Sequence, residues 1–149
     1  MRFPLSETPS VHTRSLSEKL GYASYLSGIV PSGEKKGLSL QVNIWTAAIY
    51  HEQIHFFFDE KGSPVAYVMW AFPSPDVQLM LAANPSYVLH ESEWDEAGPP
   101  WIVDLVVMPG YLRSVLRNIS SKILKDADIV RFVHSKPNRR RVITWRVQG

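Results

Sequence analysis

The chain has 149 residues, of which 45% are hydrophobic and 20% charged, and its formal net charge is +2. This length suits one domain with a substantial core. The absence of cysteine excludes disulfides, thiolate chemistry and cysteine-based metal sites. With so small a net charge, an electrostatic partner must meet a local patch.

The N-terminal residues predict a loose arm over 1–14, followed by a single domain over 15–149. Pro4 and Pro9 interrupt the arm, which lacks the apolar core of a signal peptide. No apolar stretch is long enough to cross a bilayer, so we expect a cytoplasmic protein. A helix is predicted from Ser15 to Gly28, because apolar residues recur there at helical spacing.

A basic loop over 31–37 separates this helix from a second one predicted over 38–52. Two apolar segments, 53–58 and 65–71, then flank a glycine-bearing turn, which predicts a β-hairpin. The second segment is almost entirely apolar, as in a central strand covered on both faces. His51 and His55 would share a face only on a helix, and the strand prediction therefore argues against a metal site there.

The second half of the chain predicts a short helix over 75–83, with Leu79 facing inward, and an irregular acidic segment over 84–100. A strand over 101–107 and an amphipathic helix over 111–125 follow. Two strands near 129–134 and 142–147 complete the order. The predicted class is therefore α/β (α+β), with one layer of mixed, mostly antiparallel sheet and helices packed on it.

Asp104 stands out because it is the one carboxylate in the apolar run 101–107. An ionised carboxylate in a buried strand costs several kcal/mol unless it is paired, raised in pKa or kept for a task. Two interpretations remain open. Asp104 is either a structural residue that accepts main-chain N–H bonds near Pro109 and Gly110, or a catalytic residue.

Four pieces of the chain, in order, resemble the toxin-activating lysine acyltransferases, which fatty-acylate internal lysines of RTX haemolysins. The pieces are Leu20-Gly21 with Ser24-Tyr25-Leu26, then Pro64-Val65-Ala66-Tyr67 with Trp70-Ala71, then Glu93-Trp94 with Gly98, and finally Trp101-Ile102-Val103-Asp104 with Pro109-Gly110. The resemblance runs from about Leu20 to the C-terminus.

This resemblance implies a GNAT-like acyltransferase fold, an acyl carrier protein as donor, a lysine as acceptor and a homodimer. No cofactor is implied as permanently bound; the acyl-phosphopantetheine of the carrier is the co-substrate. The family's catalytic aspartate corresponds to Asp104. Its catalytic histidine falls at or beside Gly33, where this chain has no histidine.

Another histidine is one way to fill that role, and His55 and His51 near the hairpin are the candidates. A base-free mechanism is a second way, because holding both reactants together supplies much of the acceleration. Two further alternatives stay open. One is a catalytically inactive binding module or chaperone of the same fold. The other is a GNAT-type enzyme that uses coenzyme A, although the chain has no glycine-rich pyrophosphate loop.

An acyl carrier protein is acidic, so its docking site should be basic. The candidates are Lys35 and Lys36 in the loop, and Arg139, Arg140 and Arg141 near the C-terminus. Nucleic acid is a weaker partner for these arginines, given the low net charge and the acidic segment over 91–96.

A fatty chain needs an apolar groove, and aromatic side chains are the candidates for its wall. We select Tyr67, Trp70 and Trp101, with Trp45 and Trp94 as further candidates; core packing is the alternative for all of them.

Overall fold

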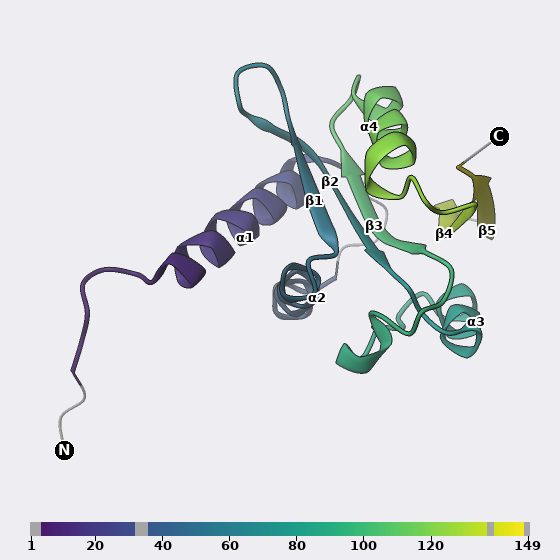
Figure 1. Cartoon of the computed structure of the whole chain (residues 1–149), viewed down its shortest axis with the longest axis horizontal. Coiled ribbons are helices and arrows are strands. Elements are labelled where there is room, and N and C mark those ends of the chain that lie inside the picture. The colour runs from purple at the N-terminus through teal and green to yellow at the C-terminus, as the bar shows by residue number, and fades with distance from the viewer. Residues whose placement is uncertain (1–3, 32–35, 137–138, 148–149) are drawn as a thin grey trace.

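The computed structural model describes residues 4–31, 36–136 and 139–147. A five-stranded sheet forms the middle layer, and helices cover both of its faces (Figure 1). The predicted α/β class with a mixed, mostly antiparallel sheet is confirmed.

The strands lie in chain order across the sheet: β1 (Ile54–Phe58), β2 (Pro64–Ala71), β3 (Trp101–Val107), β4 (Ile129–Lys136) and β5 (Arg139–Arg146). All neighbours are antiparallel except β3 and β4, which are parallel. These two strands share a single registered pair, Trp101 with Arg131. The sheet is therefore well paired on both sides of this junction and loosely paired at it.

The predicted β-hairpin joins β1 and β2. Its turn is stabilised by Asp59, whose Oδ1 accepts hydrogen bonds from the N–H groups of Lys61 and Ser63. Gly62 has a φ of +82°, a conformation that glycine adopts without steric cost. Polar turn chemistry between two apolar segments is what made this element predictable.

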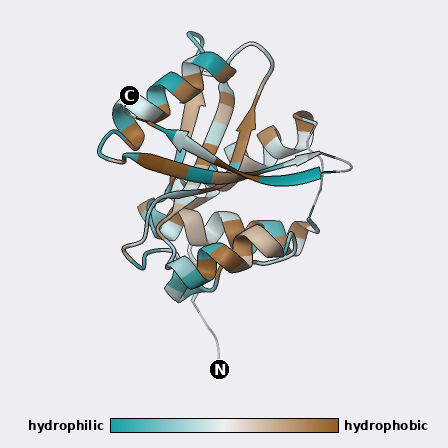
Figure 2. Ribbon diagram, turned by 90° about the vertical axis from the view of Figure 1, so that its right-hand side faces the viewer, coloured by the Kyte–Doolittle hydropathy of each residue, from teal (hydrophilic) through white to brown (hydrophobic). Residues whose placement is uncertain are grey.

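Three helices cover one face of the sheet: α1 (Val11–Ile29), α2 (Leu38–Tyr50) and α3 (Pro75–Ala83). With β2 and β3 they bury one of the two apolar cores, which includes Leu26, Trp45, Tyr67 and Met69. Each fully buried apolar side chain of this size stabilises the fold by about 1.5–3 kcal/mol. Figure 2 shows the apolar strands enclosed between the helical layers.

Two predictions about these helices are wrong. α1 begins at Val11, not Ser15, because Ser10 acts as N-cap and its side chain accepts from the N–H of Thr13. Residues 11–14 thus belong to the helix and not to a loose arm. In α3, Ser74 caps the helix as Pro75 begins it, but Leu79 is 69% exposed and the buried positions are Val77 and Gln78.

The opposite face is covered by α4 (Leu112–Asn118), which continues as a π-helical turn, η2 (Ile119–Ile123). The predicted helix over 111–125 is therefore regular only in its first half. Val115 and Ile119 pack there on Ala66, Val68, Ile102 and Val130. The acidic segment before β3 is irregular as predicted, apart from the short 3₁₀ turn η1 (Glu91–Glu93).

None of the helices in the described part of the chain combines the length and apolarity that a bilayer crossing requires.

Candidate active site

Asp104 lies in β3 directly after a β-bulge. The pairing of β2 with β3 shifts between Met69 and Trp70, so that Trp70 faces Ile102, Met69 faces Asp104, and Val103 is the extra residue. Because side chains alternate along a strand, regular pairing from Trp101 would turn Asp104 toward α4. The bulge turns it instead toward α1 and α2.

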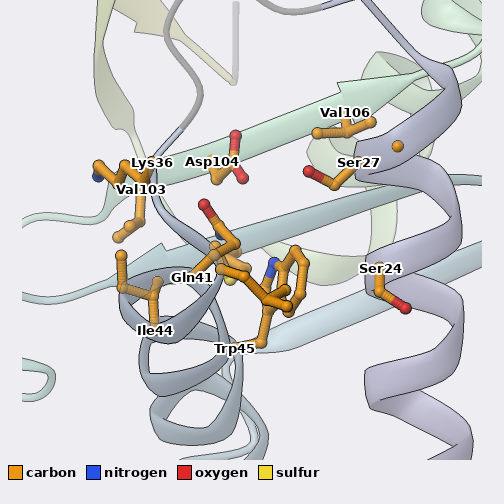
Figure 3. A pocket seen from close by; sticks show the side chains of 12 residues that line it. Ser24, Ser27, Lys36, Gln41, Ile44, Trp45, Val103, Asp104 and Val106 are labelled. Atoms are coloured by element: carbon orange, nitrogen blue, oxygen red, sulfur yellow. The ribbon is translucent and has the colours of Figure 1, made fainter.

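On that face Asp104 borders a pocket of about 310 Å³ between α1, α2 and the sheet. Figure 3 shows the Asp104 carboxylate between Ser27 of α1 and Gln41 of α2, with Trp45 beneath. Ser24, Lys36 and Val106 also line the pocket. We call it the Asp104 pocket.

A chain of two hydrogen bonds fixes the carboxylate from below. The hydroxyl of Tyr67 in β2 donates to Oδ2 of Asp104 over 2.7 Å, and Nε1 of Trp45 in α2 donates to that hydroxyl over 3.3 Å. Tyr67 is fully buried and Trp45 is 2% exposed. The sheet and α2 thus position Asp104 together, through side chains that have little freedom to move.

Burial raises the pKa of Asp104 above its ordinary value. The Tyr67 hydrogen bond, the positive charge of Lys36 and the Leu105 amide oppose that rise. For Tyr67, burial is the main cause of a raised pKa, and the Asp104 charge adds to it, so the phenol stays a proton donor. A carboxylate with a raised pKa is a better proton acceptor than an ordinary aspartate, and the site is chemically suited to general-base work.

Asp104 also borders a second cavity, of about 280 Å³, where β3 and β4 separate beyond Trp101 and Arg131. His134 lines this cavity and was not among the predicted site residues. Asp104 and His134 each lie three residues after a member of that pair. His134 could not be predicted as a neighbour of Asp104 from the sequence alone, because their proximity depends on the parallel pairing of β3 with β4.

The two predicted histidines lie away from the Asp104 pocket. His55 of β1 pairs with Val68 of β2, and it therefore lies on the opposite face of the sheet, the one that α4 covers. Partial burial and the Lys122 charge lower the pKa of His55 there. His51 ends α2 and stacks on Trp94, with ring centroids 5.9 Å apart. Neither lines the Asp104 pocket, so the expectation that one of them pairs with Asp104 is not supported.

The aromatic residues predicted to line an acyl groove lie in different parts of the structure. Tyr67 lies beneath Asp104 as a hydrogen-bond donor and lines none of the cavities described above. Trp70 packs on the α4 side, and Trp101 is buried opposite Ala71. Of the aromatic candidates, Trp45 is the one that lines the Asp104 pocket.

The basic residues predicted to bind a carrier protein also lie in different places. Lys36 is exposed at the mouth of the Asp104 pocket, whereas Lys35 and Gly33 lie outside the described residues. The Arg140 guanidinium donates to the main-chain oxygens of Leu81 (2.8 Å) and Ala82 (2.7 Å) in α3. Arg139 and Arg141 are exposed. Arg140 therefore fastens α3 to β5, and carrier docking by the remaining residues stays a prediction.

Comparison with known proteins identifies the family. A profile described as HlyC, the RTX toxin acyltransferase family, matches residues 13–146. The chain belongs to the RTX toxin acyltransferase family. The resemblance seen in the sequence is thereby confirmed, and Asp104 lies within the matched range. No curated protein sequence matches the chain significantly.

Two solved structures resemble this family member at low identity. Naa20 from Chaetomium thermophilum, in complex with a bisubstrate analogue, is 20% identical, with 81% of this chain and 60% of that chain aligned and a TM-score of 0.46. A histone acetyltransferase HPA2 and related acetyltransferase from Corynebacterium glutamicum is 12% identical, with 87% and 75% aligned and a TM-score of 0.41. Both scores lie below 0.5, so the fold assignment rests on the sheet and helices described above.

Proposed function

We propose that this protein transfers an acyl group from the thioester of an acyl carrier protein to the side-chain amine of a lysine in an RTX-type partner protein. The observation that carries the proposal is the place of Asp104: it lies within the residues matched by the family profile and borders a pocket of about 310 Å³ between α1, α2 and the sheet. Asp104 is the catalytic residue of the proposal.

The proposed step forms one bond and breaks one. The lysine Nζ attacks the thioester carbonyl carbon, a C–N bond forms, and the C–S bond breaks. The lysine ammonium first passes one proton to the Asp104 carboxylate, and the neutral amine then attacks. As the amide forms, the nitrogen loses a second proton, which is transferred to the departing pantetheine sulfur, so that the sulfur leaves as a thiol. A base is needed because a lysine amine, with a pKa of about 10.4, is mostly protonated at neutral pH.

No imidazole lines the Asp104 pocket within the described residues, and the resemblance puts the family's histidine at or beside Gly33, where the sequence has none. His134 lines the separate cavity between β3 and β4. The proposal therefore gives the proton-accepting role to Asp104 itself. Tyr67 is a positioning residue, since its hydroxyl holds one carboxylate oxygen and leaves the other for the proton. Confinement of the two reactants beside Asp104 supplies the rest of the acceleration.

The test combines acyl-loaded carrier protein with lysine peptides from candidate acceptors and follows the intact mass of each peptide. The wild-type protein should add one acyl group, and Asp104→Asn should lose at least about 100-fold in rate, the usual contribution of a general base. Asp126→Asn, at an exposed aspartate outside the pocket, is the matched control and should keep full activity.

Three other outcomes would contradict the proposal in distinct ways. Carrier binding without transfer to any acceptor would indicate the inactive binding module. Transfer from acyl-coenzyme A but not from the carrier would indicate the coenzyme A alternative. Transfer that survives Asp104→Asn unchanged would remove Asp104 from the chemistry.

A further inference from the structure

Lys36 lies at the mouth of the Asp104 pocket. It directly precedes Gly37, the N-cap of α2, and its side chain lines the pocket. Figure 3 shows it beside Val103, on one side of the Asp104 carboxylate. Among the lysines whose side chains the structure describes, Lys36 is the one that lines this pocket. The proposed reaction acylates a lysine amine beside Asp104, and the chain itself supplies such an amine there.

The Lys36 ammonium lies near the Asp104 carboxylate without being fixed to it. Its positive charge opposes the rise of the Asp104 pKa, and an effect of this kind falls off with distance. Within the described residues no hydrogen bond or close ion pair holds the ammonium. The side chain is exposed, and a lysine stem has four flexible carbons. The amine can therefore turn toward a thioester bound in the pocket.

The wall of the pocket on α1 leaves room for this movement. Small residues form it, namely Ser24, Ser27 and Gly28. Nothing lies within 4 Å of a Cβ atom built at Gly28. Figure 3 shows this wall on the far side of Asp104 from Lys36. A thioester carbonyl can therefore enter between α1 and Lys36 without displacing a bulky side chain.

An amine of the same chain has an advantage over an amine in solution. A group tethered beside a site has an effective concentration on the order of millimolar. Holding two reactants together also removes much of the entropic barrier to their reaction. Lys36 should therefore react whenever a loaded carrier arrives before a partner lysine does.

We propose that Lys36 is itself an acceptor, so that the protein acylates its own Lys36 when an acyl-loaded carrier docks and no partner lysine occupies the Asp104 pocket. This inference rests on the proposed function and adds a modification site to it. The Lys36 ammonium passes one proton to Asp104, and Nζ attacks the thioester carbonyl carbon. The C–N bond forms, the C–S bond breaks, and the second proton of the nitrogen goes to the sulfur, which leaves as a thiol.

The modification changes the charge at the mouth of the pocket. An amide carries no positive charge, so the acylated protein loses the cation that an acidic carrier would meet there. The pKa of Asp104 should also rise further, because the opposing charge of Lys36 is gone. Self-acylation therefore slows further transfer as long as no acceptor protein is present.

The test incubates the protein with acyl-loaded carrier and no acceptor, follows its intact mass and locates the acyl group by peptide fragmentation. Wild type should gain one acyl group, on Lys36. Lys36→Arg keeps the charge and should lower the rate of adduct formation at least about tenfold, because no other lysine is held beside the site. Lys61→Arg makes the same change at an exposed lysine of the hairpin turn and should keep the adduct.

Two further reactions separate this chemistry from simple reactivity of the thioester. Asp104→Asn should slow adduct formation at least about 100-fold. A mixture of Asp104→Asn with Lys36→Arg should leave both proteins unmodified, because the base and the acceptor then lie in different molecules. An adduct that forms equally fast in Asp104→Asn overturns the inference, as does an acyl group found on the Asp104→Asn protein of the mixture.

A lysine peptide added to the same reaction keeps this inference apart from the proposed function. Acylation of Lys36 without acylation of any peptide supports the inference and counts against the proposed acceptor. Acylation of the peptide with Lys36 unmodified, even when the peptide is left out, overturns the inference and leaves the proposed function standing. Acylation mainly at other lysines overturns the inference too, and no transfer to either acceptor overturns both.

Discussion

Tyr67 is the side chain that donates a hydrogen bond to the Asp104 carboxylate. Its hydroxyl donates to the carboxylate and accepts from Trp45, so Tyr67→Phe leaves one buried acceptor and one buried donor unsatisfied. We expect a loss of about 1–3 kcal/mol in the free energy of unfolding. Loss of the hydrogen bond should also raise the pKa of Asp104 further, because that bond favours the charged form.

The measurement that separates a positioning role from a merely structural one is the pH profile of transfer. In Tyr67→Phe the acidic limb should move to higher pH, whereas simple destabilisation would lower the rate without moving the limb. Tyr25→Phe, at a half-exposed position of α1, is the control.

The raised pKa of Asp104 also makes a prediction about stability. Because the folded protein holds the Asp104 proton more tightly than the unfolded chain, the contribution of this group to stability is fully present below the ordinary aspartate pKa of about 3.9. Stability from this group is then lost as the pH rises through the folded pKa. Asp104→Asn removes the ionisation and should lessen the decline in stability as the pH rises above about 4.

Urea unfolding of wild type and Asp104→Asn at a series of pH values from about 4 to neutral tests the direction of this change in stability. A larger decline in Asp104→Asn than in wild type would contradict the assignment of burial as the dominant cause. At neutral pH the variant should be at least as stable as wild type while it loses transfer activity.

At the scale of elements, the segment before β3 is held in place by a close main-chain contact. A Cβ atom at Gly98 would lie 1.8 Å from the main-chain oxygen of Pro73, which cannot move aside easily. The Gly98 N–H also donates to the Phe72 oxygen. Gly98→Ala should therefore destabilise the protein by more than about 2 kcal/mol.

Gly21→Ala is the matched control, because nothing lies within 4 Å of a Cβ there and the residue is in the interior of α1. That variant should be neutral or stabilised by up to about 1 kcal/mol. Thermal unfolding of the two variants should move the melting temperature in opposite directions, or leave it unchanged for Gly21→Ala. Equal losses in both would count against the close contact.

Arg140 makes a second prediction at this scale, because it connects β5 to the end of α3. Arg140→Ala leaves two main-chain oxygens without their charged donor and should cost about 1–3 kcal/mol. Arg139→Ala and Arg141→Ala, at exposed neighbours, should change stability by less than about 0.5 kcal/mol. Denaturant midpoints of the three variants test the difference.

At the scale of the whole molecule, the proposed function makes a prediction about the docking of an acyl carrier protein. The formal net charge of +2 is small, so docking must depend on local groups such as Lys36 at the mouth of the Asp104 pocket. Exposed charges are screened over about 10 Å at 0.1 M salt. Carrier affinity should fall as salt is added, and Lys36→Glu should weaken it more than Lys125→Glu.

Binding isotherms at several ionic strengths check this prediction. A carrier affinity that does not change with salt concentration would contradict it. A cytoplasmic location and a homodimer stay predictions of the same kind, and sedimentation of the full chain tests the second.

Much of the element order was predictable from local features, namely the Asp59–Gly62 turn of the hairpin, the Ser74–Pro75 start of α3 and the apolar spacing of α1. The site was predictable only in part. Asp104 could be singled out as a carboxylate in an apolar strand, but its partners could not. Tyr67 is 37 positions away along the chain, and Trp45, which donates to Tyr67, lies a further 22 positions away.

By itself, the sequence determined the class of fold and the family and singled out Asp104 as a candidate, because these depend on residue types and short-range periodicity. The tertiary structure decided which face of the sheet Asp104 lies on, through one extra residue at Val103. It also joined Arg140 to α3 and placed His55 on the far face of the sheet. The physical reason is that side chains alternate every residue along a strand, so a shift of one position, set by pairing with a distant strand, reverses every orientation that follows.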